Sequence, residues 1–112
     1  MRGVKITPYE NCVIYCLESI DGVNQYIGGT SNFYQRKIHH KYRCNNITSL
    51  EYEYQVYRKI RATGGFENYS FRILQENINV KCRRDLLDIE KKYIDLIRPN
   101  LNTYLTYRKK TN

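Results

Sequence analysis

The hydrophobic residues of this chain gather in three short runs that predict β-strands. Residues 12–17 are rich in β-branched and aromatic side chains, and residues 25–27 form a shorter run that ends at two glycines. The Asp21-Gly22 pair between them is a turn signal, so we expect the two runs to pair as a hairpin. Residues 68–75 alternate between polar and apolar positions and predict a third strand.

A helical pattern follows the hairpin over residues 32–43, with Thr30 or Ser31 as the expected N-cap. Two neighbouring stripes of side chains run along this helix. The first is apolar and is expected to be buried, and the second places Arg36 and His40 one turn apart on the same side. The first stripe comprises Tyr34, Ile38 and Tyr42, and the second comprises Phe33, Arg36 and His40.

A second helix is predicted to follow Thr48, because Thr48 and Glu51 have the spacing of a capping box. It should extend to about Ala62, since Gly64 and Gly65 then supply a common C-terminal stop. Its expected stripe comprises Leu50, Tyr54, Tyr57 and Arg61.

Residues 81–98 carry the most regular helical pattern in the chain, after a predicted loop over 76–80. Five apolar side chains fall within an arc of roughly 120° when residues are placed about 100° apart. Glu90 lies inside this arc, whereas most charged residues of the helix lie opposite it. Pro99 ends the helix, because its ring cannot continue the hydrogen-bond pattern. The apolar residues of the arc are Leu86, Leu87, Tyr93, Ile94 and Ile97.

These elements predict a single α/β domain of the α+β type over residues 1–112. A small antiparallel sheet of about three strands would be flanked by about three main helices. The core would cover about residues 12–104, and residues 105–112 would form a basic tail. A chain of 112 residues buries enough surface for one core and leaves no room for a second lobe.

Charge is the strongest feature of the composition. Nineteen Lys and Arg residues against eleven Asp and Glu residues give a net charge of +8, which favours polyanionic partners such as nucleic acid. Twelve tyrosines add side chains that stack on bases or bond to phosphates. Anionic membranes and acidic proteins are alternative partners for a basic surface of this kind.

The sequence has no apolar run near the roughly 20 residues of a membrane-spanning helix, and its N-terminus lacks the apolar segment of a signal peptide. We therefore expect an intracellular, soluble protein without a membrane partner. In a reducing compartment its four cysteines should be small, buried or half-buried residues without disulfides. They are Cys12, Cys16, Cys44 and Cys82.

Three polar residues on the predicted helices suggest chemistry beyond packing. Glu90 on an apolar arc must be paired, hydrogen-bonded or bound to a metal, because an isolated buried carboxylate is costly. Arg36 matches the geometry of two phosphate oxygens, and His40 is able to take a proton from water near neutral pH. Each has an alternative: a structural network for Glu90, a solvated side chain for Arg36, and a surface or core position for His40. Tyr15 and Tyr26, taken singly, would be core residues.

Together these residues resemble the GIY-YIG nuclease family. The five matching elements occur in the family's order and cover about residues 12–104. They are Val13-Ile14-Tyr15, Tyr26-Ile27-Gly28, Thr30-Ser31-Asn32 with Arg36 and His40 on the helix that follows, Glu90, and Asn102 within Arg98-Pro99-Asn100-Leu101-Asn102. Two positions depart from the pattern: Val13 stands where the first motif has Gly, and Gly29 stands where some members carry a polar or basic residue.

The resemblance implies a role for each matching polar residue. Tyr15 would help to activate the attacking water or relay its proton, and Tyr26 would hydrogen-bond the phosphate or a metal-bound water. Arg36 would stabilise charge on the phosphoryl oxygens, and His40 would assist proton transfer.

The resemblance also implies a metal. Glu90 would hold a single divalent cation, Mg2+ or alternatively Mn2+, and Asn102 would orient the site. The expected reaction is in-line attack of water on a phosphodiester bond, without a covalent enzyme intermediate.

The resemblance therefore implies a metal-dependent DNA endonuclease with DNA as its partner. The chain is short for sequence reading, so a structure-selective or weakly specific enzyme fits it better, with a protein partner or homo-oligomer as a further source of specificity. The alternative is a non-catalytic basic nucleic-acid-binding protein or adaptor that retains the fold. Metal dependence separates the two, because binding through Lys and Arg needs no metal.

Overall fold

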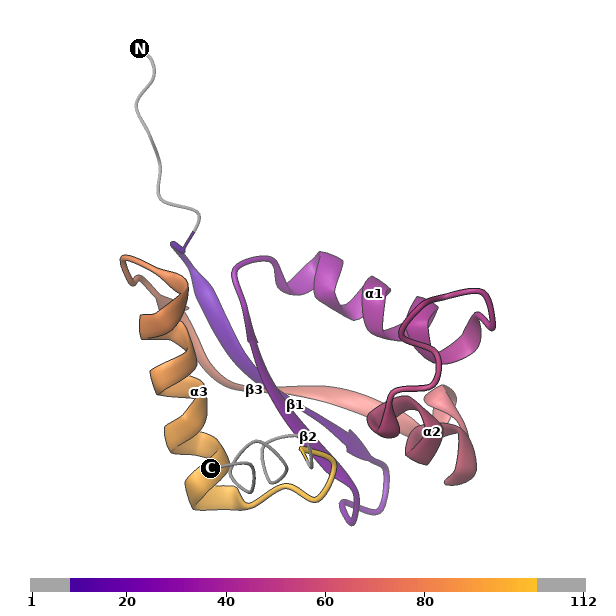
Figure 1. Cartoon of the computed structure of the whole chain (residues 1–112). Helices are drawn as coiled ribbons and strands as arrows, with labels where there is room; N and C mark the ends of the chain where they lie inside the picture. Colours follow the sequence, from indigo (N-terminus) through magenta and orange to yellow (C-terminus); the bar gives the residue numbers. More distant parts are fainter. Residues whose placement is uncertain (1–8, 103–112) are drawn as a thin grey trace, which may run out of the picture.

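The computed structural model describes residues 9–102, which form one sheet flanked by helices (Figure 1). The predicted fold class, a small antiparallel sheet of three strands with three α-helices, is confirmed. Residues 103–104 of the expected core and the expected basic tail lie outside the described residues. In chain order the elements are β1 (Cys12–Ser19), β2 (Gln25–Thr30), α1 (Phe33–Asn45), α2 (Gln55–Ala62), the 3-10 turn η1 (Phe66–Asn68), β3 (Tyr69–Ile78) and α3 (Arg83–Ile97).

The sheet has the strand order β2-β1-β3, and both neighbouring pairs are antiparallel. The β1–β2 hairpin turns at the predicted place, where Gly22 has a φ of 76°. Its register sets Tyr15 opposite Gly28 and Leu17 opposite Tyr26. The two tyrosine-containing runs therefore lie side by side, as the turn signal predicted.

β1 is the central strand and is buried along almost its whole length, because helices cover both faces of the sheet (Figure 1). α3 packs on one face, where Ile14 and Leu86 belong to one apolar cluster. α1 and α2 pack on the other face, where Leu17 and Tyr57 belong to a second cluster. Alternate residues of β1 thus face opposite clusters, as the two-residue period of a strand requires.

β2 is an edge strand, and the segment after α3 bonds its outer edge. The N–H of Gln25 donates to Asn100 Oδ1 at 2.8 Å, and the Gln25 carbonyl accepts from the N–H of Leu101 at 2.9 Å. Asn102 Oδ1 accepts from the N–H of Ile27 at 2.8 Å, and Asn102 Nδ2 donates to the Ile27 carbonyl at 2.9 Å. These bonds occupy backbone groups that would otherwise attract another strand.

α1 presents a different stripe to the sheet from the one expected. The apolar stripe of Tyr34, Ile38 and Tyr42 is exposed, with Tyr34 73% accessible to solvent, so this prediction is wrong. The neighbouring stripe faces the sheet instead: His40 is buried, and Phe33 packs against Tyr15 with ring centroids 5.5 Å apart. The facing surface is aromatic and polar, so hydrophobicity alone selected the wrong stripe.

The N-cap of α1 is Asn32, not Thr30 or Ser31. Asn32 Oδ1 accepts from the N–H of Gln35 at 3.0 Å. Thr30 belongs to β2, and its Oγ1 accepts from the N–H of Asn32 at 3.0 Å. Two successive side-chain bonds therefore shape the turn from β2 into α1.

α2 begins at Gln55 and not after Thr48, so the predicted capping box does not form. Ser49 instead bonds locally to Glu51, whose N–H donates to Ser49 Oγ at 3.2 Å, and such contacts favour a turn over a helix start. The predicted end at Ala62 is confirmed. Of the expected stripe, Leu50 and Tyr54 are exposed, Arg61 is half-buried and Tyr57 is buried.

The remaining elements differ from prediction at their margins. β3 extends to Ile78, into the expected loop, because Ile78 pairs with Cys12 at the start of β1. α3 lies within the predicted range, and Leu86 is buried as expected. Leu87 is exposed, contrary to the predicted arc, whereas Ile89 packs against the α3-side cluster. Real packing thus rotates the buried arc slightly from the one read from hydrophobicity.

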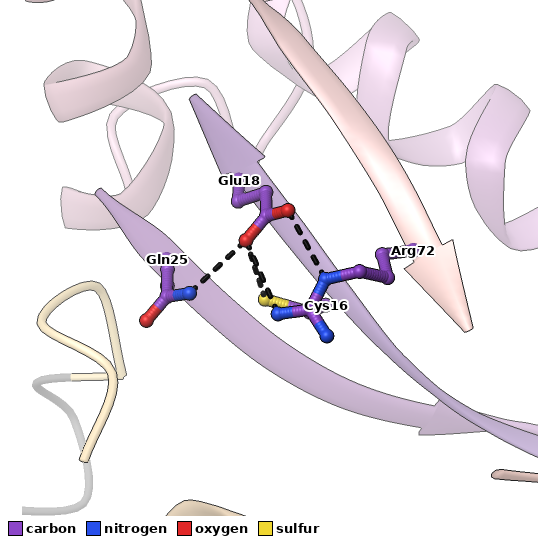
Figure 2. Close-up of polar contacts among 4 residues, drawn as sticks. All are labelled: Cys16, Glu18, Gln25 and Arg72. Carbon is purple, nitrogen blue, oxygen red and sulfur yellow. Dashed lines mark hydrogen bonds and ion pairs between the residues drawn. The ribbon is translucent and has the colours of Figure 1, made fainter. Parts of the chain in front are cut away.

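Glu18 joins the three strands through a polar cluster (Figure 2). Its carboxylate accepts from Gln25 Nε2 of β2 at 3.0 Å and from Arg72 Nε of β3 at 3.1 Å. The hydrogen bond from Arg72 lowers the pKa of Glu18, and burial together with the Glu18 charge raises the pKa of Cys16 to about 11. Cys16 is therefore a protonated thiol at neutral pH. The cluster has a structural role, because its hydrogen bonds connect the three strands.

The four cysteines are free thiols. Cys12, Cys16 and Cys44 are buried as predicted, whereas Cys82 is exposed and departs from that prediction. Among residues 9–102, no helix is long and apolar enough to cross a membrane.

Candidate active site

A groove of about 1060 Å3 lies between α3, the edge strand β2 and the start of α1. Four of the six residues predicted for the site line it: Tyr26, Arg36, Glu90 and Asn102. Basic residues on and just after α3 add to its wall, namely Arg83, Arg84, Lys91 and Arg98, together with the acidic Asp88 and Asp95.

Two consecutive glycines of β2 form part of the groove wall. A Cβ atom built on Gly28 would lie 2.5 Å from the Tyr15 hydroxyl, and one built on Gly29 would lie 3.2 Å from Glu90 Oε1. Neither glycine has a positive φ, so the need is for close approach rather than for backbone freedom. Tyr15 and Glu90 therefore reach adjacent positions of one strand from opposite faces of the sheet.

Glu90 enters the groove from α3 and is only 8% exposed. Burial raises the pKa of its carboxyl to about 7, against the opposing effects of the Arg36 and Arg83 charges and of the Gly29 backbone N–H. The predicted position of Glu90 on the inward face of the helix is confirmed. No salt bridge to it is formed by the described residues, so its charge is balanced over longer distances.

Arg36 enters the groove from the first turns of α1. Its Nη1 lies 3.5 Å from the Gly29 carbonyl and 3.5 Å from the Tyr15 hydroxyl. Gly29 thus has Arg36 at its carbonyl and Glu90 at its N–H. A cation from α1 and an anion from α3 converge on one residue of the edge strand, although the two helices lie on opposite faces of the sheet.

Tyr15 and His40 lie behind the groove wall and do not line it. The Tyr15 hydroxyl is 2.7 Å from His40 Nε2, and His40 Nδ1 is 2.8 Å from the hydroxyl of Tyr57. Burial, together with the nearby Arg36 and Arg43 charges, lowers the pKa of His40 to about 3. His40 is therefore a neutral imidazole at physiological pH, and burial raises the pKa of Tyr15 above its ordinary value.

Tyr26 and Asn102 complete the set of predicted residues that line the groove. Asn102 is buried, and both polar atoms of its amide bond the backbone of Ile27. Tyr26 is half-buried, lines the groove, and sets its ring edge-on to His40 with centroids 5.7 Å apart. Asn102 therefore orients β2 through its backbone, while Tyr26 offers a phenol to the groove.

Sequence reasoning missed the part played by Tyr57, which it assigned to a packing stripe. Tyr57 meets His40 only because α2 folds back against α1, and nothing in the local pattern signals that contact. The sequence marks both glycines as the end of a strand, Gly28 as the last residue of the second motif and Gly29 as a departure from the family pattern, but it does not reveal their close approach to Tyr15 and Glu90. Val13, the other departure, is buried opposite Thr30 and does not line the groove.

The donor set of the groove bears on metal binding. Within the described part of the chain, no group of three or more His, Cys, Asp and Glu side chains is placed to hold a metal ion. A cation held at the buried carboxylate of Glu90 would therefore need water and ligand oxygens to complete its shell.

Comparison of the chain with protein-family models, with curated proteins and with solved structures gives no match in any of the three. The resemblance to GIY-YIG nucleases therefore stands on the motif residues themselves.

Proposed function

We propose that this chain is a metal-dependent DNA endonuclease that hydrolyses phosphodiester bonds at the groove between α3 and β2. Support comes above all from the convergence of Arg36 and Glu90 on Gly29, at the wall of an open groove. A guanidinium suits a phosphate, and a buried carboxylate suits a hard cation. The resemblance to GIY-YIG nucleases names the same two residues independently of their geometry.

The chain's own residues divide the work in this proposal. Arg36 binds a phosphoryl oxygen and stabilises the charge that builds up on it during attack by water. Tyr26 donates its phenol hydrogen to the phosphate from β2. Tyr15 and His40 support the site from behind β2, and Asn102 holds the strand in register.

The residues present fit a divalent metal of the Mg2+ type. Mg2+ commonly binds proteins through one or two carboxylates and keeps several waters and substrate phosphate oxygens, and the groove supplies one buried carboxylate, Glu90. When bound, such a cation would act as a Lewis acid and stabilise the leaving oxygen. Mn2+ is the alternative ion.

DNA is the proposed partner because the groove wall is rich in cations. Arg83, Arg84, Lys91 and Arg98 outnumber the two carboxylates of Asp88 and Asp95 along it, and the whole chain carries a charge of +8. A protein partner or a second copy would supply any sequence specificity. The four free cysteines support a reducing, intracellular compartment.

A second candidate function is non-catalytic binding of nucleic acid, favoured by the same basic wall. The two differ in their response to conditions. Binding through Arg83 and Arg84 would need no metal and would weaken steeply with salt, and removal of either charge should reduce the salt slope by about one.

The decisive experiment compares two carboxylates of α3. Wild-type protein, Glu90→Gln and the matched control Asp88→Asn would be incubated with supercoiled plasmid and with branched DNA, with Mg2+ or with chelator. We expect nicking that requires Mg2+, that is lost in Glu90→Gln, and that persists in Asp88→Asn, because Asp88 is an exposed groove residue.

Three results would count against a metal nuclease at Glu90. Equal DNA binding by all three proteins without cleavage would favour the binding function. Cleavage that persists in the presence of chelator would show that the reaction does not require a metal. A covalent phosphotyrosine trapped during turnover would replace direct attack by water.

A further inference from the structure

A buried chain of hydrogen bonds leads from the groove into the core between α1 and α2. It runs from Arg36 at the groove to the Tyr15 hydroxyl, from there to His40 Nε2, and from His40 Nδ1 to the Tyr57 hydroxyl. Tyr15, His40 and Tyr57 are 0%, 3% and 2% exposed. Both ring nitrogens of His40 are thus occupied by hydroxyl groups, and His40 itself has no access to the groove.

The donor and acceptor groups in this series of hydrogen bonds restrict where each hydrogen atom can lie. A neutral imidazole has one donor and one acceptor nitrogen, so one of the two hydroxyls donates to the ring and the other accepts from it. The accepting hydroxyl must place its own hydrogen elsewhere. The location of that spare hydrogen decides the tautomer of His40.

Burial assigns the spare hydrogen to Tyr57. Tyr15 is fully buried, and its other polar neighbour, Arg36, is itself a donor, so the Tyr15 hydrogen has no acceptor besides His40 among the described residues. Tyr57 likewise has an arginine donor, Arg43, so the difference between the two hydroxyls is one of depth. Tyr57 is 2% exposed against 0% for Tyr15, and the side chain of Arg43 beside it is 34% exposed, so the Tyr57 hydroxyl lies nearer to solvent. The arrangement of lower cost has Tyr15 donating to Nε2, and His40 donating from Nδ1 to Tyr57.

We propose that Tyr57 is a positioning residue, which acts on the groove through His40 and Tyr15. By accepting from Nδ1–H it holds His40 in one tautomer and orientation, much as the third residue of a catalytic triad does. Nε2 then binds the Tyr15 hydrogen, which turns the lone pairs of the Tyr15 oxygen toward Arg36. The guanidinium is thereby held at Gly29. This inference rests on the proposed nuclease function, in which Arg36 stabilises the phosphoryl charge.

The kinetic test uses two buried tyrosines of the same apolar cluster. Tyr57→Phe removes the hydroxyl that bonds to His40. The control Tyr69→Phe removes a hydroxyl of the same cluster that bonds to Thr63 Oγ1 at 2.7 Å and takes no part in the hydrogen bonds from Arg36 to Tyr57. At saturating DNA, Tyr57→Phe should slow single-turnover cleavage by roughly 10- to 100-fold, with the Kd for DNA within about twofold. Tyr69→Phe should leave both values unchanged. Equal rates for wild type and Tyr57→Phe would overturn the proposal.

A second test uses no substrate and does not require the variants to be active. Long-range 1H–15N NMR of the wild type should find His40 as the neutral Nδ1–H tautomer, with a downfield Nδ1 proton that moves upfield in Tyr57→Phe and stays in place in Tyr69→Phe. An Nε2–H tautomer in the wild type would overturn the assignment.

The two tests separate failure of this inference from failure of the function on which it rests. A wild-type protein that cuts no DNA overturns the nuclease proposal and the kinetic role of Tyr57 with it. In that case the NMR result alone decides the hydrogen-bond assignment. If the wild type cleaves DNA but His40 is the Nε2–H tautomer, the nuclease proposal stands and the proposed positioning role of Tyr57 is overturned.

Discussion

Glu90 Oε1 lies 3.2 Å from the point that a Cβ atom would occupy on Gly29. That distance is tighter than most Cβ contacts in proteins, so a side chain at position 29 would require the carboxylate to shift. The carboxylate occupies the space that a side chain would need. It is also held next to the backbone N–H of the same residue, which favours its ionised form.

Gly29→Ala should therefore disturb Glu90 more than it disturbs the fold. The added methyl group also meets Ile14 Cδ1 at 3.1 Å, and overpacking of this kind costs about 1–3 kcal/mol. We expect Mg2+-dependent nicking to fall about 10- to 100-fold, because a small displacement of the carboxylate is enough. Nicking rates and urea denaturation would measure both effects. Full activity with unchanged stability would show that Glu90 tolerates the methyl group.

Glu90 should make the fold less stable as the pH rises. Its pKa is raised from an ordinary 4.5 to about 7, so the folded state binds more protons than the unfolded state between these values. Stability is therefore full below about pH 4.5 and declines as pH rises through 7. The total effect is on the order of 3 kcal/mol, from about 1.4 kcal/mol per pKa unit.

Glu90→Gln tests the direction of this pH dependence, because the substitution removes the titrating charge and keeps the shape of the side chain. Relative to wild type, the variant should be more stable at pH 8, with little gain at pH 4.5, in urea titrations at the two pH values. The same variant should lose nicking activity. A variant equally destabilised at both pH values would mean that Glu90 makes favourable charged contacts in the folded state.

His40 should give the stability of the fold the opposite pH dependence. Its pKa is lowered from 6.5 to about 3, so the unfolded state binds more protons in this interval. The stability supplied by the neutral ring is complete above about pH 6.5 and is lost as pH falls toward 3. In the wild type this loss is opposed by the stability that Glu90 gains over the same pH range, so the test is the difference between two proteins. As pH falls from 7 to 4, the unfolding free energy of His40→Gln should rise relative to that of the wild type.

Asn102 should matter to the fold before it matters to chemistry. Asn102→Ala removes two hydrogen bonds and leaves the N–H and C=O of Ile27 without those partners, at a cost of about 2–4 kcal/mol. Asn100→Ala removes the exposed bond to Gln25 and a part-buried bond to Asn24 Oδ1, and should cost about 1–2 kcal/mol. Thermal denaturation of the two variants would rank them. An Asn102→Ala protein of wild-type stability without activity would instead give Asn102 a direct role.

Local patterns predicted much of the fold. The β-rich runs, the Asp21-Gly22 turn and the long periodic helix all appeared where expected, because each depends on residues a few positions apart. The inward position of Glu90 was also predictable, since helical periodicity sets the face on which a residue lies. The errors arose where several faces competed, as on α1, or where Ser49 and Glu51 bonded locally and kept the turn from becoming a helix.

The sequence by itself determined the elements, the hairpin and the set of polar residues worth testing, because propensity, periodicity and turn chemistry act over short stretches of chain. Tertiary structure decided which stripe of α1 meets the sheet, how Tyr57 reaches His40, and how Arg36 and Glu90 meet at Gly29. Those contacts join residues from separate elements, and their geometry depends on how helices pack against both faces of the sheet. No local pattern contains that information, since the packing is settled by the burial and hydrogen bonding of the whole core.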